Sequence, residues 1–163
     1  MQRARAWGAL AVAIISLAGC ADHGRRAGPR TDSGAAIAAL AISLVGTRYH
    51  FGGADAAGFD CSGLALYVHA RVGLTIPRTA SEQQRAAHPV PLASLAPGDL
   101  VFFRVHARGV DHVGIYAGSG RFIHARRAGS AVAYGDLRED YYRARLVSAG
   151  RFWDTGPRVS APR

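Results

Sequence analysis

The spacing of apolar residues predicts helices in the first half of the chain. One stripe at helical spacing runs over residues 35–45, and Gly46 ends it. A second stripe runs over Cys61–Arg71, with Asp60 placed to cap its first turn and Gly73 following its end. A shorter helix is predicted over residues 79–87. Residues 47–59, which include adjacent glycines, are predicted to form a loop.

After residue 97 the pattern changes to the alternation that is typical of strands. Pro-Gly and Gly-Ser-Gly turns separate the apolar runs, and a short helix is predicted over residues 138–145. The predicted strands begin near Leu100 and then cover residues 110–118, 121–127, 131–137 and 145–153. Because the helices precede an antiparallel set of strands, we expect an α+β fold with N-terminal helices packed on an antiparallel sheet.

The hairpin over residues 110–127 brings two histidines onto one face of the sheet. We expect a three-residue turn, residues 118–120, because glycine tolerates its left-handed position. Gly114 then lies opposite His124 and leaves room for its ring, and His112 becomes a diagonal neighbour of His124. A two-residue turn would place the two histidines on opposite faces.

The N-terminus has the pattern of an export signal. Basic residues precede a short apolar run in residues 1–19, and the run ends in "LAGC", a sequence that resembles a bacterial lipobox. We therefore expect lipid on Cys20, a flexible tether over residues 20–34 and a disordered tail over residues 154–163. Ala21, in place of Asp, indicates attachment to the outer membrane, facing the periplasm.

The net charge of +9 comes with scattered arginines and no lysine. No basic stripe interleaved with aromatic residues is present, so nucleic acid is not an expected partner. Anionic material of the cell envelope fits such a charge equally well.

The cysteine count singles out Cys61 as a candidate nucleophile. With lipid on Cys20, the chain's other cysteine has no partner for an internal disulfide. A helix N-terminus and a nearby imidazolium both favour thiolate over thiol. Cys61 with His112 and His124 then supplies a nucleophile, a base and a group that orients the base. The Cys61 N–H can donate to the oxyanion of a tetrahedral intermediate.

Other interpretations of these residues remain open at this point. Cys61 could be a buried inert thiol, or it could bind zinc together with His112 and His124, although no metal-binding spacing is present. The remaining histidines have no convergent partners and are interpreted as surface residues; they are His23, His50, His69, His88 and His106. Tyr141 and Tyr142 are interpreted as packing residues.

Three segments, taken in order, resemble the NlpC-type cell-wall cysteine peptidases, and most closely their small Spr-type lipoproteins. They are "TRYHFGGADAAGFDCSGLALYVHARVGLTIPRTASEQQ", "LAPGDLVFF" and "DHVGIYAGSGRFIHA". The resemblance implies a papain-like domain over residues 35–153, with Cys61 as nucleophile, His112 as base and His124 as orienting residue. It also places Tyr49 near the oxyanion, and Asp60, Ser62 and Arg78 at positions that support the nucleophile or bind substrate.

The function implied by this resemblance is hydrolysis of peptidoglycan stem peptides or cross-links without metal or cofactor. The bond would be D-Ala–diaminopimelate or γ-D-Glu–diaminopimelate, and the sequence does not decide between them. The alternatives are a non-catalytic peptidoglycan-binding or scaffolding lipoprotein, and a papain-like thiol acyltransferase or amidase. The sequence does not indicate an adaptor protein.

Overall fold

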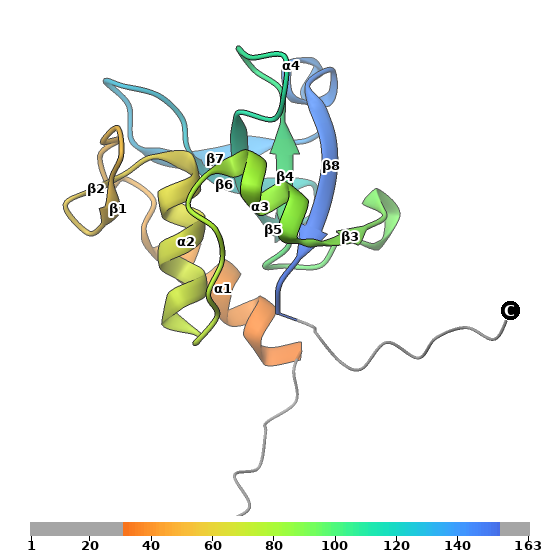
Figure 1. Ribbon diagram of the computed structural model, residues 1–163, viewed down its shortest axis with the longest axis horizontal. Coiled ribbons are helices and arrows are strands. Elements are labelled where there is room, and N and C mark those ends of the chain that lie inside the picture. The colour runs from red at the N-terminus through yellow and green to blue at the C-terminus, as the bar shows by residue number, and fades with distance from the viewer. Residues whose placement is uncertain (1–30, 154–163) are drawn as a thin grey trace, which may run out of the picture.

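A computed structural model describes residues 31–153 (Figure 1). The predicted signal peptide, Cys20, the predicted tail and most of the predicted tether lie outside the described residues. The elements are α1 (Thr31–Ser43), β1 (Ala54–Asp55), β2 (Gly58–Phe59), α2 (Cys61–Arg71), α3 (Ala80–Ala86), β3 (His88–Val90), a 3₁₀ turn (Leu92–Ser94), β4 (Leu100–Phe103), β5 (His112–Gly118), β6 (Arg121–Ala125), β7 (Val132–Asp136), α4 (Asp140–Arg143) and β8 (Leu146–Arg151).

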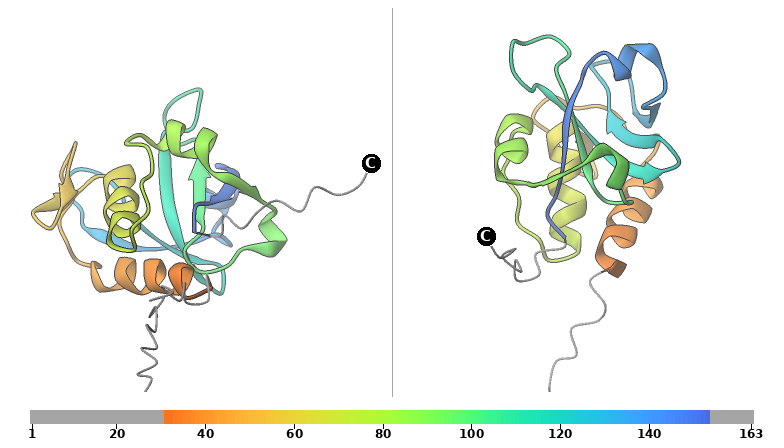
Figure 2. Two further views of the ribbon diagram at one scale, coloured as in Figure 1. Left: turned by 60° about the horizontal axis from the view of Figure 1, so that its bottom comes forward. Right: turned by 90° about the vertical axis from the view of Figure 1, so that its right-hand side faces the viewer.

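One antiparallel sheet, in the order β3-β8-β4-β5-β6-β7, forms the centre of the domain. Helices α1 and α2 pack on each other and on β5, as Figure 1 and the turned views of Figure 2 show. Strand β4 is buried on both faces, with Leu100 and Phe102 toward the helices and Val101 and Phe103 toward a second apolar cluster. The α+β class, with N-terminal helices on an antiparallel sheet, is confirmed.

The four predicted helices are present, but the ends of α1 and α4 differ from the predicted ones. Helix α2 has the predicted bounds, and the Asp60 side chain accepts a hydrogen bond from the Gly63 N–H as its N-cap. Thr79 caps α3 and forms a capping box with Glu82. Helix α1, however, begins at Thr31, inside the predicted tether. Its Gly34 lies so close to Trp153 and Pro97 that an added Cβ would sit 2.6 Å from each, and this tertiary packing is not visible in the local sequence.

The β5–β6 hairpin has the predicted register but a different turn. Ile115 faces Ile123, so the histidines share a face, as expected. The loop itself has two residues, Ser119 and Gly120, both at positive φ, and Gly118 faces Arg121. A bulge between Tyr116 and Gly118 supplies the extra residue that restores the parity of the faces.

Some elements were not predicted, and two residue assignments were wrong. The short hairpin β1–β2 lies in the predicted loop, and β3 pairs with β8 from the far end of the chain. His69 is fully buried in α2 rather than on the surface. The space beside Gly114 holds the ring of Phe122, not that of His124, because an added Cβ there would lie 2.4 Å from Phe122.

The two ends of the described chain meet on one side of the domain. Gly34 in α1 contacts Trp153, which follows β8. Nearby, Arg151 forms a buried ion pair with Asp99, at 2.7 Å, just before β4 begins. Among residues 31–153, no helix has the length and apolar character needed to cross a bilayer.

Candidate active site

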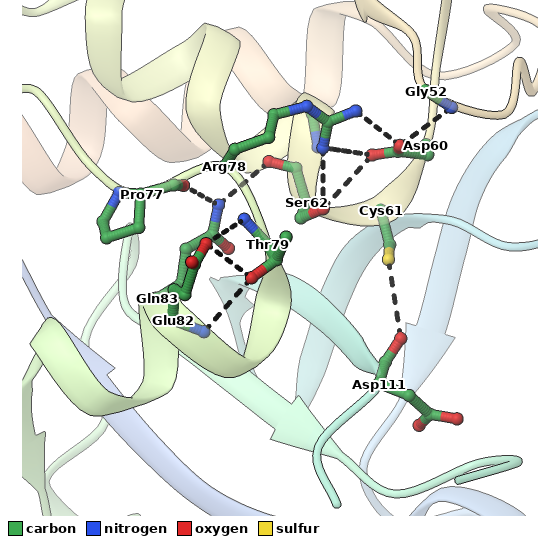
Figure 3. Close-up of polar contacts among 11 residues, drawn as sticks. Gly52, Asp60, Cys61, Ser62, Pro77, Arg78, Thr79, Glu82, Gln83 and Asp111 are labelled. Atoms are coloured by element: carbon green, nitrogen blue, oxygen red, sulfur yellow. Dashed lines mark hydrogen bonds and ion pairs between the residues drawn. The ribbon is translucent and has the colours of Figure 1, made fainter.

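Cys61 is the first residue of α2, so its geometry follows from the helix terminus. Its backbone N–H belongs to the first turn, where no preceding carbonyl of the helix can accept a bond. The thiol Sγ lies 4.0 Å from the carbonyl oxygen of Asp111, the residue before β5 (Figure 3). Cys61 is partly exposed, and its thiol forms no disulfide within the described part of the chain.

Asp60, Ser62 and Arg78 bind one another behind the nucleophile. Arg78 donates from its two terminal nitrogens to the Asp60 carboxylate, at 2.6 and 3.1 Å, and to the Ser62 hydroxyl at 2.9 Å (Figure 3). Gly52 and Gly63 donate backbone N–H groups to the same carboxylate. Burial alone would raise the pKa of Asp60, but the bonds from Arg78 and Gly63 outweigh it and lower that pKa. The carboxylate therefore stays charged and holds the loop before α2 against the helix.

Gln83 is a supporting residue that the sequence did not single out. It is fully buried on α3, and its amide nitrogen donates to the Ser62 carbonyl at 3.0 Å and to the Pro77 carbonyl at 2.8 Å. Figure 3 shows it joining the first turn of α2 to the segment that carries Arg78. The contact depends on how α3 docks, so no local pattern predicts it.

His112 and His124 form a hydrogen-bonded pair on the sheet face that was predicted. The Nε2 atom of His112 lies 2.8 Å from Nδ1 of His124, and both rings are buried. On the far side, Nε2 of His124 lies 3.3 Å from the hydroxyl of Tyr142. With Nε2 of His112 engaged, its Nδ1 is the ring nitrogen left to act as base. Tyr142 was interpreted as a packing residue, and its polar contact arises only from the tertiary position of α4.

The electrostatics of the resting site differ from the predicted thiolate. Burial raises the pKa of the Cys61 thiol, and backbone hydrogen bonds from Val113 and Ser62 offset only part of that rise. Burial also lowers the pKa of His112 to about 4 and that of His124 to about 3. A helix N-terminus favours the thiolate, but here desolvation is the larger effect. At neutral pH the free site holds a thiol and two uncharged imidazoles.

Two cavities flank Cys61. The first, of about 310 Å³, is lined by His112 and His124, the β6–β7 loop and α4. The second, of about 300 Å³, is lined by Asp60, Ser62 and the N-terminus of α3. Tyr49 and Asp111 border both cavities, whereas Arg78 borders neither. Cys61 lines both cavities as well, so a peptide bound in both would have Cys61 beside it.

Tyr49, predicted to contact the oxyanion, lines both cavities together with Cys61. Burial raises the pKa of its hydroxyl, and negative charge on Cys61 would raise it further, which reflects how near the two side chains are. The phenol therefore remains protonated at neutral pH and can donate a hydrogen bond.

The zinc interpretation requires ligands from Cys61, His112 and His124. Within residues 31–153 there is no group of three or more His, Cys, Asp or Glu side chains arranged to hold a metal ion. The facing ring nitrogens of His112 and His124 are hydrogen-bonded to each other.

Comparison with known proteins identifies the family of the chain. Residues 46–151 match the model of the NlpC/P60 family. The chain is 45% identical over 115 residues to the murein DD-endopeptidase MepH of Escherichia coli, covering 68% of this chain and 42% of that protein. It is 41% identical to the bifunctional muramidase/DL-endopeptidase CwlT of Bacillus subtilis, covering 68% of this chain and 34% of that one. The match therefore spans less than half the length of either relative.

Solved structures show the same fold. An NlpC/P60 family protein from Bacillus cereus superposes with a TM-score of 0.69 at 32% identity, covering 77% of this chain and 41% of that one. The NlpC/p60 domain of the peptidoglycan hydrolase SagA gives a TM-score of 0.64 at 35% identity, covering 73% of this chain and 98% of that domain. The α+β domain described here belongs to the NlpC/P60 family.

Proposed function

We propose that this protein is a cysteine peptidase that hydrolyses amide bonds in peptidoglycan peptides. The observation that carries the proposal is the His112–His124 pair, bonded at 2.8 Å, on the lining of the cavity that also holds Cys61. The two curated relatives described above are named as endopeptidases, one of them a murein enzyme. Peptidoglycan stem peptides are accordingly the proposed substrate class.

The first half of the reaction forms a thioester. Nδ1 of His112 takes the thiol proton of Cys61 as Sγ attacks the substrate carbonyl carbon, and the developing oxyanion accepts hydrogen bonds from the Cys61 N–H and the Tyr49 hydroxyl. The C–N bond then breaks, and the leaving amine takes the proton from His112. His124 orients the ring of His112 and stabilises its cation while that cation exists.

The second half regenerates the thiol. A water molecule attacks the thioester carbon and gives its proton to His112, and the C–S bond breaks. The sulfur leaves with the bonding electrons and recovers the proton from His112, while the carboxylic acid departs. An uncharged resting imidazole suits both halves, since each begins with proton uptake.

The proposal extends to the cell envelope. Lipid on Cys20 would attach the protein to the outer membrane facing the periplasm, and no adaptor protein is specified. The cleaved bond is D-Ala–diaminopimelate or γ-D-Glu–diaminopimelate; relatives named DD- and DL-endopeptidases are both among the matches.

Digestion of defined muropeptides tests the activity. Cys61→Ala and His112→Ala should each lower product formation at least about 1000-fold, because each removes one half of the nucleophile–base unit. His50→Ala, which removes an exposed ring bordering neither cavity, is the matched control and should retain activity. Unchanged cleavage by Cys61→Ala would contradict the mechanism.

The same digest separates the alternative functions. A non-catalytic binding lipoprotein releases no product, and an acyltransferase releases product only with an acceptor other than water. Thiol alkylation at neutral pH is less decisive, because the raised pKa of Cys61 predicts slow alkylation even in an active enzyme.

A further inference from the structure

The two cavities beside Cys61 can be assigned to the two halves of a cleaved peptide. This assignment rests on the proposed function. His112 must deliver a proton to the departing amine, and the histidine pair lines only the first of the two cavities. The leaving half therefore occupies the first cavity, and the acyl half, which stays on the sulfur, occupies the second.

The first cavity is cationic. Arg126 and Arg127, at the end of β6, line it together with His106. Both arginines are exposed, and among residues 31–153 neither takes part in an ion pair with Asp or Glu. Burial is the main cause of the lowered pKa of His112 and His124, and the positive charge of Arg126 lowers both further, because it lies on the same cavity lining as the two rings.

The acidic residue on this lining is already satisfied. Asp111 is the lone Asp or Glu among the described residues that border the first cavity. Its carboxylate accepts backbone N–H bonds from Val105, His106 and Ala107, at 2.7, 2.7 and 2.8 Å. It therefore holds the β4–β5 loop, and it forms no ion pair with either arginine in the described part of the chain.

We propose that Arg126 and Arg127 bind a free carboxylate on the leaving half of the substrate, next to the amine that departs. Guanidinium groups bind carboxylates through paired, charge-assisted hydrogen bonds. In a D-Ala–diaminopimelate cross-link, the carbon that bears the leaving nitrogen also bears a free carboxylate. In a γ-D-Glu–diaminopimelate bond within a longer stem, that carboxyl is itself in an amide. The site thus selects the cross-link as substrate.

Binding to a Cys61→Ala variant tests the site without cleavage. The probes are two synthetic D-Ala–diaminopimelate cross-link peptides, which differ only in whether the carboxyl group beside the scissile amide is free or a carboxamide. We expect calorimetry to show at least about tenfold tighter binding of the free acid. Arg126→Gln with Arg127→Gln should abolish this preference. Arg85→Gln, on the exposed side of α3 and outside both cavities, should preserve it.

Three results would overturn the carboxylate site: equal affinity for the two peptides, a preference that survives in the double arginine variant, or no measurable binding of the free acid. Hydrolysis by the intact enzyme is scored separately. Selective binding without hydrolysis would refute the peptidase function and leave the site standing. Equal binding of the two peptides, together with hydrolysis of both at equal kcat/KM, would refute the carboxylate site and support the peptidase function.

Discussion

At the scale of single residues, the protonation state of His112 controls the proposed chemistry. Burial lowers the pKa of His112 to about 4, and the proton acceptor in the reaction is the uncharged ring. Because His112 and His124 are in contact, the titration observed belongs to the pair. The base is therefore available well below the pH at which an ordinary imidazole would be protonated.

This predicts an unusually low acid limb in the pH profile. Activity depends on the uncharged base, so kcat/KM should hold from neutral pH down to about 5 and fall as pH drops through about 4. Initial rates on a muropeptide between pH 3.5 and 8, with circular dichroism to confirm that the fold persists, measure the limb. An acid limb with its midpoint near pH 6.5, the ordinary pKa of His, would show that burial does not determine the pKa of His112.

Tyr142 should affect the rate through its contact with His124. Tyr142→Phe removes the hydroxyl that lies 3.3 Å from Nε2 of His124 and keeps the ring that packs in the second apolar cluster. A lost hydrogen bond of about 1 kcal/mol corresponds to a loss of about fivefold in kcat, with KM unchanged. Tyr134→Phe is the control, because its exposed ring on β7 borders neither cavity. Equal losses in both variants would rule out this role.

The sequence predicts residues better than it predicts their partners. Cys61, His112 and His124 could be found because a cap, a helix start and strand parity are local properties. Tyr142, Gln83 and Arg126 could not be assigned in this way. Their contacts depend on how α4, α3 and the β6–β7 loop are placed in three dimensions, and none of these placements leaves a periodic signal.

At the scale of elements, close backbone contact fixes the start of α2, the helix that carries Cys61. Gly63, in the first turn of α2, packs so tightly on Gly53 that an added Cβ would lie 2.0 Å from the Gly53 carbonyl oxygen. That carbonyl also accepts a hydrogen bond from the Asp60 N–H at 3.0 Å. The loop that contains Gly53 cannot move away from α2 without breaking this hydrogen bond. The first turn of α2 can therefore lie this close to the loop only because Gly63 has no side chain.

Gly63→Ala should therefore displace the start of α2. We expect a loss of at least about 2 kcal/mol in the free energy of unfolding, and a fall in kcat larger than the fall in folded fraction. Gly109→Ala is the matched control, because nothing lies within 4 Å of its added Cβ. Urea denaturation followed by muropeptide assays gives both quantities. Identical behaviour of the two variants would contradict the close contact.

The β5–β6 hairpin shows which features of an element can be predicted. The apolar alternation predicted which residues share a face, since a one-residue slip would turn Ile115 or Ile123 away from the core. The turn was wrong because two arrangements preserve that parity: a three-residue loop, or a two-residue loop with a bulge. Positive φ at Ser119, a residue other than glycine, is part of the second arrangement and could not be inferred from composition.

At the scale of the whole molecule, a buried histidine outside the site makes the fold sensitive to acid. His69 is fully buried, its Nδ1 bonds the Ala65 carbonyl at 2.8 Å, and its Nε2 has no partner among the described residues. Burial lowers the pKa of His69 to about 4. The folded state thus binds this proton less readily than the unfolded chain, and stability present above about pH 6.5 is lost as pH falls toward 4.

His69→Leu should reduce this sensitivity. Up to about 3 kcal/mol of the stability lost between pH 6.5 and 4 comes from this one ring, and leucine fills the site without a titratable group. Urea denaturation at several pH values should show a shallower decline for His69→Leu than for the native protein. His50→Gln, at an exposed position, should leave the decline unchanged. Parallel curves for the native protein and His69→Leu would assign the acid sensitivity to other groups.

The central sheet separates the candidate active site from the two ends of the described chain. His112 lies opposite Phe103 at one end of β4, and Gly150 lies opposite Leu100 at the other end, where Trp153 meets α1. The domain could be attached through either end of the described chain, whether to a lipid, a second domain or a solid support. The two cavities beside Cys61 would then face away from the point of attachment. A protein held at a surface in this orientation can work on a polymer mesh in front of it, and its reach depends on the length of the linkage rather than on any hinge in the domain.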